Sequence, residues 1–192
     1  IEETEEIMRA ILKQANIGVD GRLTDFVGPV RIADTWEKVV ADVVEYMDKA
    51  KESVYFATTS FDGRVAESCL RAAQRGVKLN FLTDKETISN KLQMLRMLLS
   101  EPKTLKFFFE YLSSPDFQIR FLDIPYSFIV VDQKYSMIEV THPYTHAFSM
   151  AFLFHNEKLC ERLIATFEAM WRRGQKMETP IPSTIPSICL LY

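Results

Sequence analysis

The chain has 192 residues and a formal net charge of -3, with 47% hydrophobic and 26% charged residues. This length and apolar content are sufficient for one ordinary domain with a sizeable core. Because the net charge is weakly negative, the surface as a whole does not attract nucleic acid. We therefore expect no direct DNA binding by this segment.

The cysteines and the hydropathy pattern bear on the compartment. Cys69, Cys160 and Cys189 lack the spacing of a metal site and leave an odd thiol, so we expect no disulfide framework and a reducing, cytoplasmic environment. No stretch approaches the roughly 18 consecutive apolar residues of a membrane helix, and the start lacks a signal-peptide pattern. We expect no membrane partner and no cofactor. The absence of a methionine before Ile1 predicts a piece of a longer protein.

Residues 1–27 are expected to form an N-terminal amphipathic helix and a loop. Residues 3–15 carry apolar side chains at helical spacing, with acidic residues in the first turns. This helix either packs on its own domain or acts as a dimerising or linker helix, and the pattern leaves both readings open. Glycines and Gly28-Pro29 then predict a loop.

The next segment predicts a strand, helix, strand unit. Asp34 to Glu37 has the spacing of a capping box before an apolar helical series, which predicts a helix over residues 35–51. Residues 53–60 and 77–82 read as strands, and between them Asp62 begins a helix that ends at Gly76. We therefore expect a parallel strand pair.

The second half of the chain predicts helices, then strands, then one helix. Residues 86–112 read as two helices separated at Pro102. The predicted strands cover residues 117–122, 126–132, 135–140 and 148–154, with a turn at Gln133-Lys134, and a last helix begins after Asn156 and ends at Gly174. Residues 28–174 thus form the main domain, and residues 175–192 form a proline-rich tail.

The segment from Phe117 to Val140 carries the frame of a known motif. Its Val130-Val131-Asp132 ending resembles the end of the His-x-Lys-x-x-x-x-Asp pattern of the phospholipase D superfamily. Counting back from Asp132, Pro125 stands where that family has its nucleophilic His, and Ser127 stands where it has its Lys. The resemblance therefore implies the fold without the catalytic groups, because proline cannot attack phosphorus and a hydroxyl carries no charge.

Other pieces of sequence extend the resemblance over residues 28–174. They are Ala50-Lys51 before a strand, residues 72–77 (Ala-Ala-Gln-Arg-Gly-Val) before another, and Phe167 and Trp171 on the last helix. The resemblance implies an α/β fold with a mixed sheet flanked by helices and a helical insertion at about 86–112. Because two motifs meet in that family and this chain has one, it also implies a homodimer.

The non-catalytic form of the fold resembles the effector domain of archaeal TrmB-type sugar-responsive transcription regulators. That resemblance implies a small-molecule effector, either a sugar or another small metabolite, and DNA binding only through a separate domain. If a pocket survives at the former catalytic location, strand-end residues should line it. The candidates are Thr59, Ser60, Phe61, Arg64, Arg120, Tyr126, Ser127, Glu139 and His142.

Alternative sites remain at this stage. Met94, Met97 and residues 107–109 suit an acyl chain or another hydrophobic ligand, although the pattern favours core packing, because helical Met and Phe mostly fill interiors. His142 and His146 have an i, i+4 spacing, but Pro143 between them indicates a loop, and we expect no metal site. An acid–base pair of Asp132 and His142 competes with a turn role for Asp132.

Three functions follow. The first is a ligand-sensing, dimeric regulatory domain that moves an attached DNA-binding or signalling domain. The second is a structural dimerisation or scaffold domain of a signalling protein that binds no small molecule. The third, a phosphodiesterase, lacks its nucleophile and its Lys in this sequence.

Overall fold

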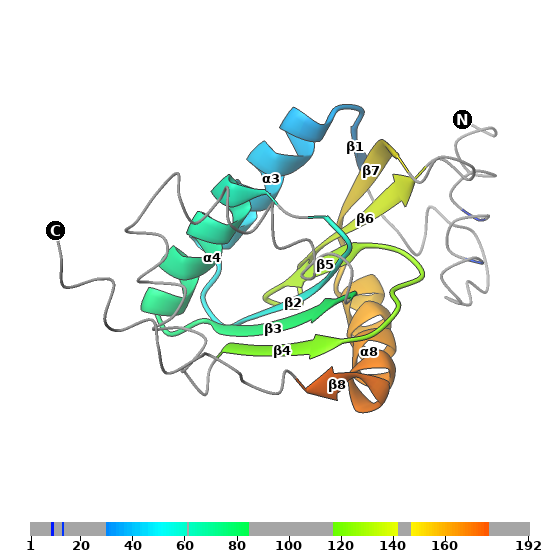
Figure 1. Cartoon of the computed structure of the whole chain (residues 1–192). Helices are drawn as coiled ribbons and strands as arrows, with labels where there is room; N and C mark the ends of the chain where they lie inside the picture. The colour runs from blue at the N-terminus through cyan, green and yellow to red at the C-terminus, as the bar shows by residue number, and fades with distance from the viewer. Residues whose placement is uncertain are drawn as a thin grey trace, which may run out of the picture.

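One mixed β-sheet with helices on both faces forms the framework of the protein (Figure 1). It is seen in a computed structural model that describes residues 30–60, 62–84, 117–141 and 147–176, together with Arg9 and Lys13. Within these residues the strands of the eight-stranded sheet follow the order β1-β7-β6-β5-β2-β3-β4-β8. Their bounds are Val30–Ala33 (β1), Ser53–Thr58 (β2), Lys78–Thr83 (β3), Phe117–Phe121 (β4), Phe128–Val131 (β5), Tyr135–Thr141 (β6), Phe148–His155 (β7) and Gln175–Lys176 (β8).

The predicted strand, helix, strand unit is confirmed. β2 and β3 run parallel, with Ser53 opposite Lys78, and the helix α4 (Gly63–Gln74) connects them. β4 extends the parallel set on the far side of β3, whereas β5 pairs with β2 in the antiparallel direction. The sheet is therefore mixed, as the family resemblance implied.

The helix α3 (Trp36–Lys49) begins one residue later than the capping-box pattern predicts. Its N-cap is Thr35, whose hydroxyl accepts a hydrogen bond from the backbone N–H of Lys38 at 3.3 Å. The carboxylate of Asp34 instead pairs with the Lys38 ammonium at 2.6 Å. The prediction of Asp34 as the cap is wrong because both residues have side-chain oxygens suited to the role, and the backbone turns at Thr35.

The other two helices have the predicted N-caps, and α8 ends at the predicted Gly174, whereas α4 ends at Gln74, two residues before the predicted Gly76. Asp62 caps α4 by accepting from the Arg64 N–H at 2.9 Å, and beyond the helix Gly76 has a positive φ of 85°. Asn156 caps the helix α8 (Glu157–Arg173) by accepting from the Leu159 N–H at 2.9 Å, and Gly174 ends it. Polar caps and glycines at these places fixed the bounds in the sequence.

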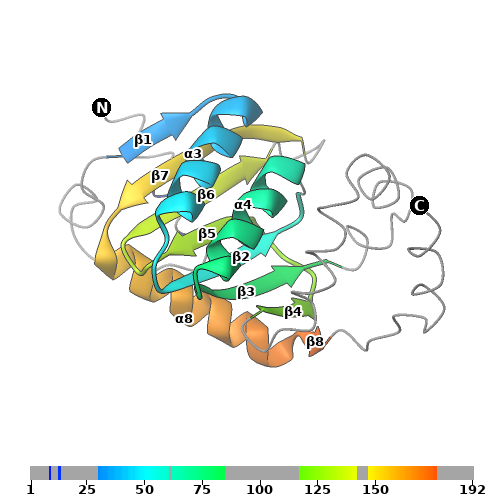
Figure 2. The ribbon, with the colours of Figure 1, turned by 90° about the vertical axis from the view of Figure 1, so that its left-hand side faces the viewer.

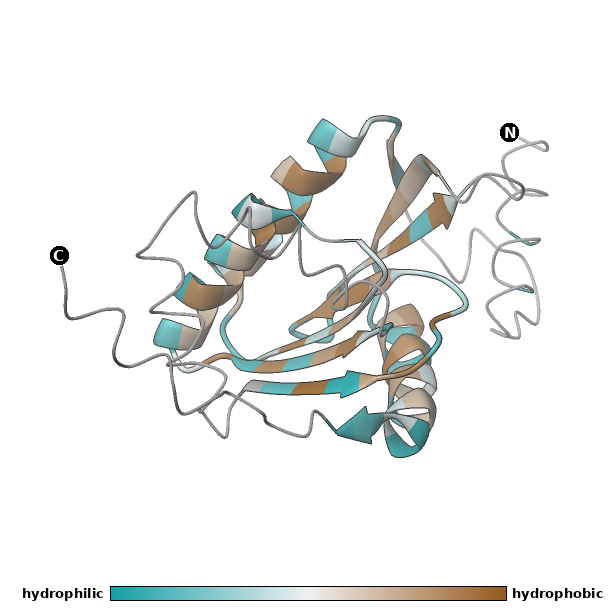
Figure 3. Cartoon of the chain, in the orientation of Figure 1, coloured by the Kyte–Doolittle hydropathy of each residue, from teal (hydrophilic) through white to brown (hydrophobic). Residues whose placement is uncertain are grey.

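Two apolar cores lie on opposite faces of the sheet. α3 and α4 cover one face and α8 covers the other (Figure 2). All four residues of the central strand β5 are buried: Ile129 and Val131 pack in the core under α3 and α4, whereas Phe128 and Val130 pack in the core under α8. Apolar residues accordingly concentrate on the helix surfaces that face the sheet (Figure 3). This double burial explains why β5 reads as a continuous apolar run.

The turn between β5 and β6 lies one residue earlier than predicted. Asp132 and Gln133 have positive φ values of 50° and 57°, and the Lys134 N–H donates to the Val131 carbonyl at 3.1 Å. Two central residues with positive φ are typical of the tight hairpin turns whose twist matches the strands. The turn therefore centres on Asp132-Gln133 rather than Gln133-Lys134.

The sequence does not predict the two edge strands, β1 and β8. β1 pairs with β7 immediately after the predicted loop, and β8 pairs with Arg120 and Phe121 of β4. β8 thus adds two residues to the sheet beyond the domain boundary expected at residue 174. Such short strands carry no alternation to detect, because backbone pairing alone defines them.

Several expectations concern other parts of the chain. The amphipathic helix at residues 3–15, the helices at 86–112 and the tail beyond 176 lie outside the described residues, apart from Arg9 and Lys13. Cys69 and Cys160 are buried free thiols in the cores on opposite faces of the sheet. No helix in the described ranges has both the length and the apolar character required to cross a lipid bilayer.

Candidate functional site

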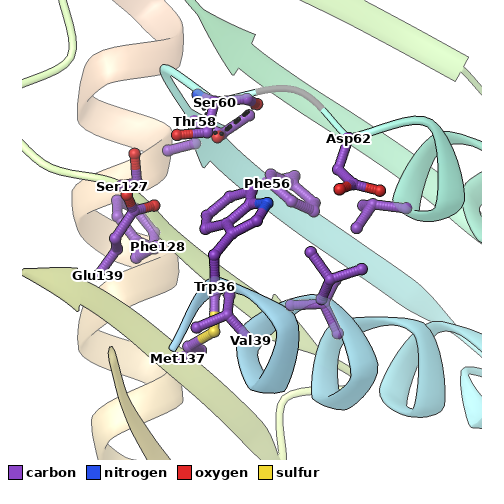
Figure 4. Close-up of a pocket in the computed structure, with 14 residues that line it drawn as sticks. Trp36, Val39, Phe56, Thr58, Ser60, Asp62, Ser127, Phe128, Met137 and Glu139 are labelled. Atoms are coloured by element: carbon purple, nitrogen blue, oxygen red, sulfur yellow. Dashed lines mark hydrogen bonds between the residues drawn. The ribbon is translucent and has the colours of Figure 1, made fainter. Parts of the chain in front are cut away.

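A cavity of about 30 Å³ lies where the ends of β2, β5 and β6 meet the N-termini of α3 and α4 (Figure 4). The three strand ends coincide because β5 runs antiparallel to both of its neighbours. The described lining residues are mostly apolar, with the hydroxyl groups and Glu139 on one side and Asp62 on the other. They are Trp36, Val39, Val40, Val43, Phe56, Ala57, Thr58, Ser60, Asp62, Val65, Ser127, Phe128, Met137 and Glu139.

Ser127 connects two sides of the cavity. Its hydroxyl oxygen lies 3.3 Å from the backbone nitrogen of Thr59, from which it accepts, and 3.4 Å from the Thr59 hydroxyl. The Ser127 carbonyl accepts from the backbone N–H of Glu139 at 2.9 Å, and the two side chains also share a hydrogen bond. Ser127 therefore joins the end of β2 to β6.

Glu139 places a carboxyl group almost fully inside the protein. The residue is only 6% exposed, and no salt bridge reaches it from the described residues. Burial raises the pKa of this carboxyl above its usual value, and the hydrogen bond from Ser127 offsets part of that effect. A buried carboxyl without a counter-charge prefers the neutral form, so it attracts either a proton or a cation.

The N-termini of α3 and α4 form the other side of the cavity. The Trp36 indole shares a hydrogen bond with the Asp62 carboxylate and packs edge-on against Phe148, with 5.6 Å between ring centroids. Arg64 is held by Asp62 at 3.0 Å and by Glu37 at 2.6 Å. The hydrogen bond from Arg64 is the main cause that lowers the pKa of Asp62, so Asp62 stays ionised at neutral pH.

Strand alternation divides the predicted site residues between two faces. Ser127 and Glu139 face α3 and α4, whereas Tyr126, adjacent in sequence to Ser127, packs with Phe128 in the core under α8. Burial there raises the pKa of Tyr126 to about 12. Arg120 also lies on the α8 face, where its guanidinium stacks on Trp171 and donates to the Trp171 carbonyl at 2.7 Å. Arg120 and Tyr126 are thus separated from the cavity by the sheet.

The remaining candidates fall into three groups. Ser60 lines the cavity, and Thr59 contacts it through Ser127. Arg64 lies at its rim, 52% exposed and paired with carboxylates. Phe61 and His142 lie outside the described residues, as does His146.

Sequence reasoning missed lining residues that come from α3 and from strand interiors. Trp36, Val39 and Val43 were assigned to helix packing, and Phe56 and Met137 to strands. Asp62 was identified only as a cap. One available signal was that Trp36 and Asp62 each belong to the first turn or cap of a helix, next to the predicted strand ends.

The Asp132 side chain binds backbone groups at the end of β5 that lies away from the cavity. Its carboxylate accepts from the backbone N–H groups of Lys51, Glu52 and Ser53 at 2.9, 2.8 and 3.1 Å. These three bonds hold the loop between α3 and β2 against the β5–β6 turn. The turn role, which the sequence favoured for Asp132 over an acid–base role, is the one found here.

Pro125, which stands where the resembled pattern has its nucleophile, lies outside the cavity. Pro125 is exposed, lies in the bend before β5 and is absent from the cavity lining. In the described residues no three His, Cys, Asp or Glu side chains gather as a metal site. The groups that remain at the cavity can donate and accept hydrogen bonds and can provide negative charge.

Comparison with known proteins supports the fold. No protein-family model and no curated protein match the chain. TrmBL2, an archaeal chromatin protein, matches with a TM-score of 0.59 and 14% identity, over 91% of this chain and 63% of that one. Nuc from Salmonella typhimurium, a phospholipase D family member, matches with a TM-score of 0.55 and 17% identity, over 79% and 99% of the two chains.

NucT from Helicobacter pylori is a third match, with a TM-score of 0.58, 14% identity and coverage of 77% and 97%. The predicted similarity to phospholipase D-like proteins and to an archaeal TrmB-family protein is thus confirmed at the level of the fold. The α/β class is confirmed as well, because the mixed sheet with its flanking helices matches these structures. The chain spans 63% of the length of TrmBL2.

Proposed function

We propose that this chain is a non-catalytic regulatory domain that binds a small-molecule effector at the cavity beside Ser127 and Glu139. The observation that carries the proposal is the buried Glu139 carboxyl, which faces a cavity and has no salt bridge within the described residues. A carboxyl placed there costs stability, and folds retain such costs most often at functional sites.

Catalysis is not part of the proposal. Covalent phosphoryl transfer needs a nucleophile and a positive charge that holds the phosphate. Pro125 and Ser127 occupy the positions of the nucleophile and of the Lys in the pattern that this chain resembles. The described cavity lining contains no positive group, and the ionised Asp62 carboxylate in it would repel a phosphate rather than bind it.

The cavity is placed where a ligand can move a helix. Its lining comes from the sheet on one side and from α3 on the other, and Trp36 at the start of α3 touches both Asp62 and Phe148. A ligand that displaces the Trp36 ring would favour a different seating of α3 on the sheet. That change would reach an attached domain through the segment that precedes β1.

We place this domain in a homodimeric transcriptional regulator, with DNA contacted by a separate domain. Two points support this assignment: the fold is shared with TrmBL2, and the chain spans 63% of the length of that archaeal chromatin protein. The net charge of -3 agrees with a domain that does not itself hold DNA.

A structural dimerisation domain is the second candidate, and the size of the cavity favours it. A volume of about 30 Å³ holds one or two water molecules, which is less than a free sugar needs. Ile32 is 48% exposed on the edge strand β1, where a second copy could cover it. Sedimentation of Ile32→Asp beside the wild type would show whether this edge forms a dimer.

The test of effector binding uses a variant that fills the cavity. Ser127→Val replaces the hydroxyl with a methyl group, adds a second methyl at the cavity wall and places a β-branched residue, which suits a strand, next to the start of β5. A metabolite collection is screened by thermal shift against the wild type, this variant and Ile32→Asp. Effector binding at the cavity predicts a ligand that stabilises the wild type and Ile32→Asp but not Ser127→Val. If every stabilising ligand acts equally on all three proteins, the cavity is not the effector site.

A further inference from the structure

The charge of the cavity restricts what can enter it. Asp62 and Glu139 both line it, and no Lys, Arg or His belongs to the described lining. Asp62 already has partners in Arg64 and the Trp36 indole, whereas Glu139 has Ser127. When Glu139 is ionised, its charge is therefore the one that no described group compensates.

The hydrogen-bonding capacity of Glu139 is also largely unused by the described residues. An ionised carboxylate offers about four acceptor positions, and the Ser127 hydroxyl can fill one of them. A ligand group that donates several hydrogen bonds would therefore fill the remaining acceptor positions. The ammonium group of an amine has this property, with three donors and no acceptor.

Size and ring chemistry point to the same group. The cavity of about 30 Å³ takes a group the size of one or two water molecules, which is the size of an ammonium head. Trp36 and Phe56 contribute aromatic rings to the lining (Figure 4). Aromatic faces attract cations, most strongly where water is excluded.

We infer that the cavity binds the ammonium end of a small amine effector, with the Glu139 carboxylate as its counter-charge and the Trp36 ring beside it. This inference rests on the proposed function, because it names the ligand class of the same site. The rest of the ligand extends out of the cavity, since only the ammonium group fits inside it. The described lining offers no positive group to a phosphorylated ligand, and a neutral polyol offers no counter-charge to an ionised Glu139.

The burial of Glu139 supports this inference through linkage. Burial raises the pKa of its carboxyl, so in the empty cavity a proton competes with the amine for the same group. Amine binding should therefore strengthen as the pH rises through the pKa of Glu139, and it should release a proton where the carboxyl is still protonated.

The experiment records amide spectra by NMR on the ¹⁵N-labelled full chain in an amine-free buffer. The probes are methylammonium chloride and 1,4-diaminobutane, with glucose, inorganic phosphate and sodium chloride at matched ionic strength as the other classes. Titrations extend to high millimolar concentrations, because a ligand with two non-hydrogen atoms cannot bind tightly. The resonances followed are those of Ser127, Glu139 and Trp36, including the indole N–H.

Two variants separate the site from general electrostatics. Glu139→Gln removes the charge while keeping the shape and a hydrogen bond to Ser127. Glu37→Gln removes an equal charge from the surface nearby, where Glu37 is 74% exposed and pairs with Arg64. We expect saturable shifts with both amines in the wild type, binding at least tenfold weaker in Glu139→Gln, and binding within twofold of the wild type in Glu37→Gln.

Three outcomes would overturn the inference. One is an equal response to sodium chloride, and another is equal amine binding in Glu139→Gln and the wild type. The third is a saturable response to glucose or phosphate at these resonances with none to the amines, in which case the proposed effector site stands and only the ligand class is wrong. If no probe or metabolite moves these resonances, the proposed function fails together with the inference.

Discussion

Asp132 holds Glu52 across the fold: its Oδ1 accepts from the backbone N–H of Glu52 at 2.8 Å, although 80 residues separate the two positions. Two further bonds, from the N–H groups of Lys51 and Ser53, complete the contact. The last residue of the motif that resembles a catalytic pattern therefore serves here as a clamp. It fixes the register of β2 against β5 from one end, while the cavity lies at the other.

Removing the clamp should weaken the fold. We expect Asp132→Ala to lower the free energy of unfolding by about 2–3 kcal/mol, because bonds to a charged acceptor are lost and alanine disfavours the positive φ. Asp132→Asn keeps one acceptor oxygen and tolerates this backbone, so its loss should be about 1 kcal/mol. Urea unfolding measures both. Equal losses in the two variants would contradict this ranking, because they would mean that the acceptor oxygen and the backbone tolerance kept by asparagine contribute nothing.

The pH dependence of stability should report on Glu139. Its raised pKa means that the folded state binds this proton more tightly than the unfolded state. The stabilising contribution is therefore fully present below the unfolded pKa, about 4.3, and is lost as the pH rises through the folded pKa. Glu139→Gln lacks this loss, so we expect its stability to gain on that of the wild type as the pH rises from about 4 towards neutrality.

Asp62, the other carboxyl group at the cavity, should change the pH dependence of stability in the opposite direction. The lowered pKa of Asp62 makes its contribution present above its unfolded pKa and lost as the pH falls below it. Asp62 therefore changes the free energy of unfolding only at acidic pH, whereas Glu139 changes it at higher pH. Urea unfolding at intervals from pH 4 to 8, with Glu37→Gln as the control, separates them. Parallel curves for Glu139→Gln and the wild type would refute the assignment.

Replacing each of two buried serines by alanine should lower the free energy of unfolding by different amounts. Ser127→Ala removes the acceptor of the Thr59 N–H and the partner of Glu139, so we expect a loss of about 1 kcal/mol. Among the described residues, the Ser136 hydroxyl has no hydrogen bond of ordinary geometry, and the Cys160 thiol that interacts with it is a weak partner. Ser136→Ala should therefore cost clearly less. Thermal unfolding of both variants gives the comparison, and a greater loss at Ser136 would contradict it.

Two glycine-to-alanine substitutions should change the free energy of unfolding in opposite directions. At Gly174 an added Cβ would lie 3.0 Å from the Arg120 Cβ and 3.3 Å from a methyl of Leu82, so we expect a loss of about 1–3 kcal/mol. At Gly63, the first residue of α4, the Cβ would meet nothing within 4 Å. Gly63→Ala should therefore stabilise the protein by about 0.5 kcal/mol. Denaturant unfolding that shows the same sign for both would reject the packing argument.

The sequence was most informative where the signal is local. Asp62 and Asn156 as caps, Gly76 and Gly174 as helix ends, and the apolar run of β5 all follow from the preferences of single residues or of short windows. The same local preferences could not decide between Asp34 and Thr35, because both make good caps. They gave no sign of β1 or β8, whose pairing is set by the strands next to them.

The candidate site was predictable in part for a related reason. Ser127 and Glu139 follow from counting along the motif, and both line the cavity. Arg120 and Tyr126 were placed near them by sequence distance, yet alternation along the strands turns them to the other face. Trp36 and Asp62 come from helix ends that are distant in sequence, so only the tertiary packing brings them to the cavity.

By itself, the sequence determined the order of the described helices and central strands and their α/β class, and it places Pro125 and Ser127 where the resembled pattern has His and Lys. Only the tertiary structure decided that Asp132 is a clamp, that the cavity is small and acidic, and that Glu139 is buried in it. The physical reason is that residue preferences and periodicity act over a few neighbours. Burial, charge and cavity volume instead depend on which distant segments meet.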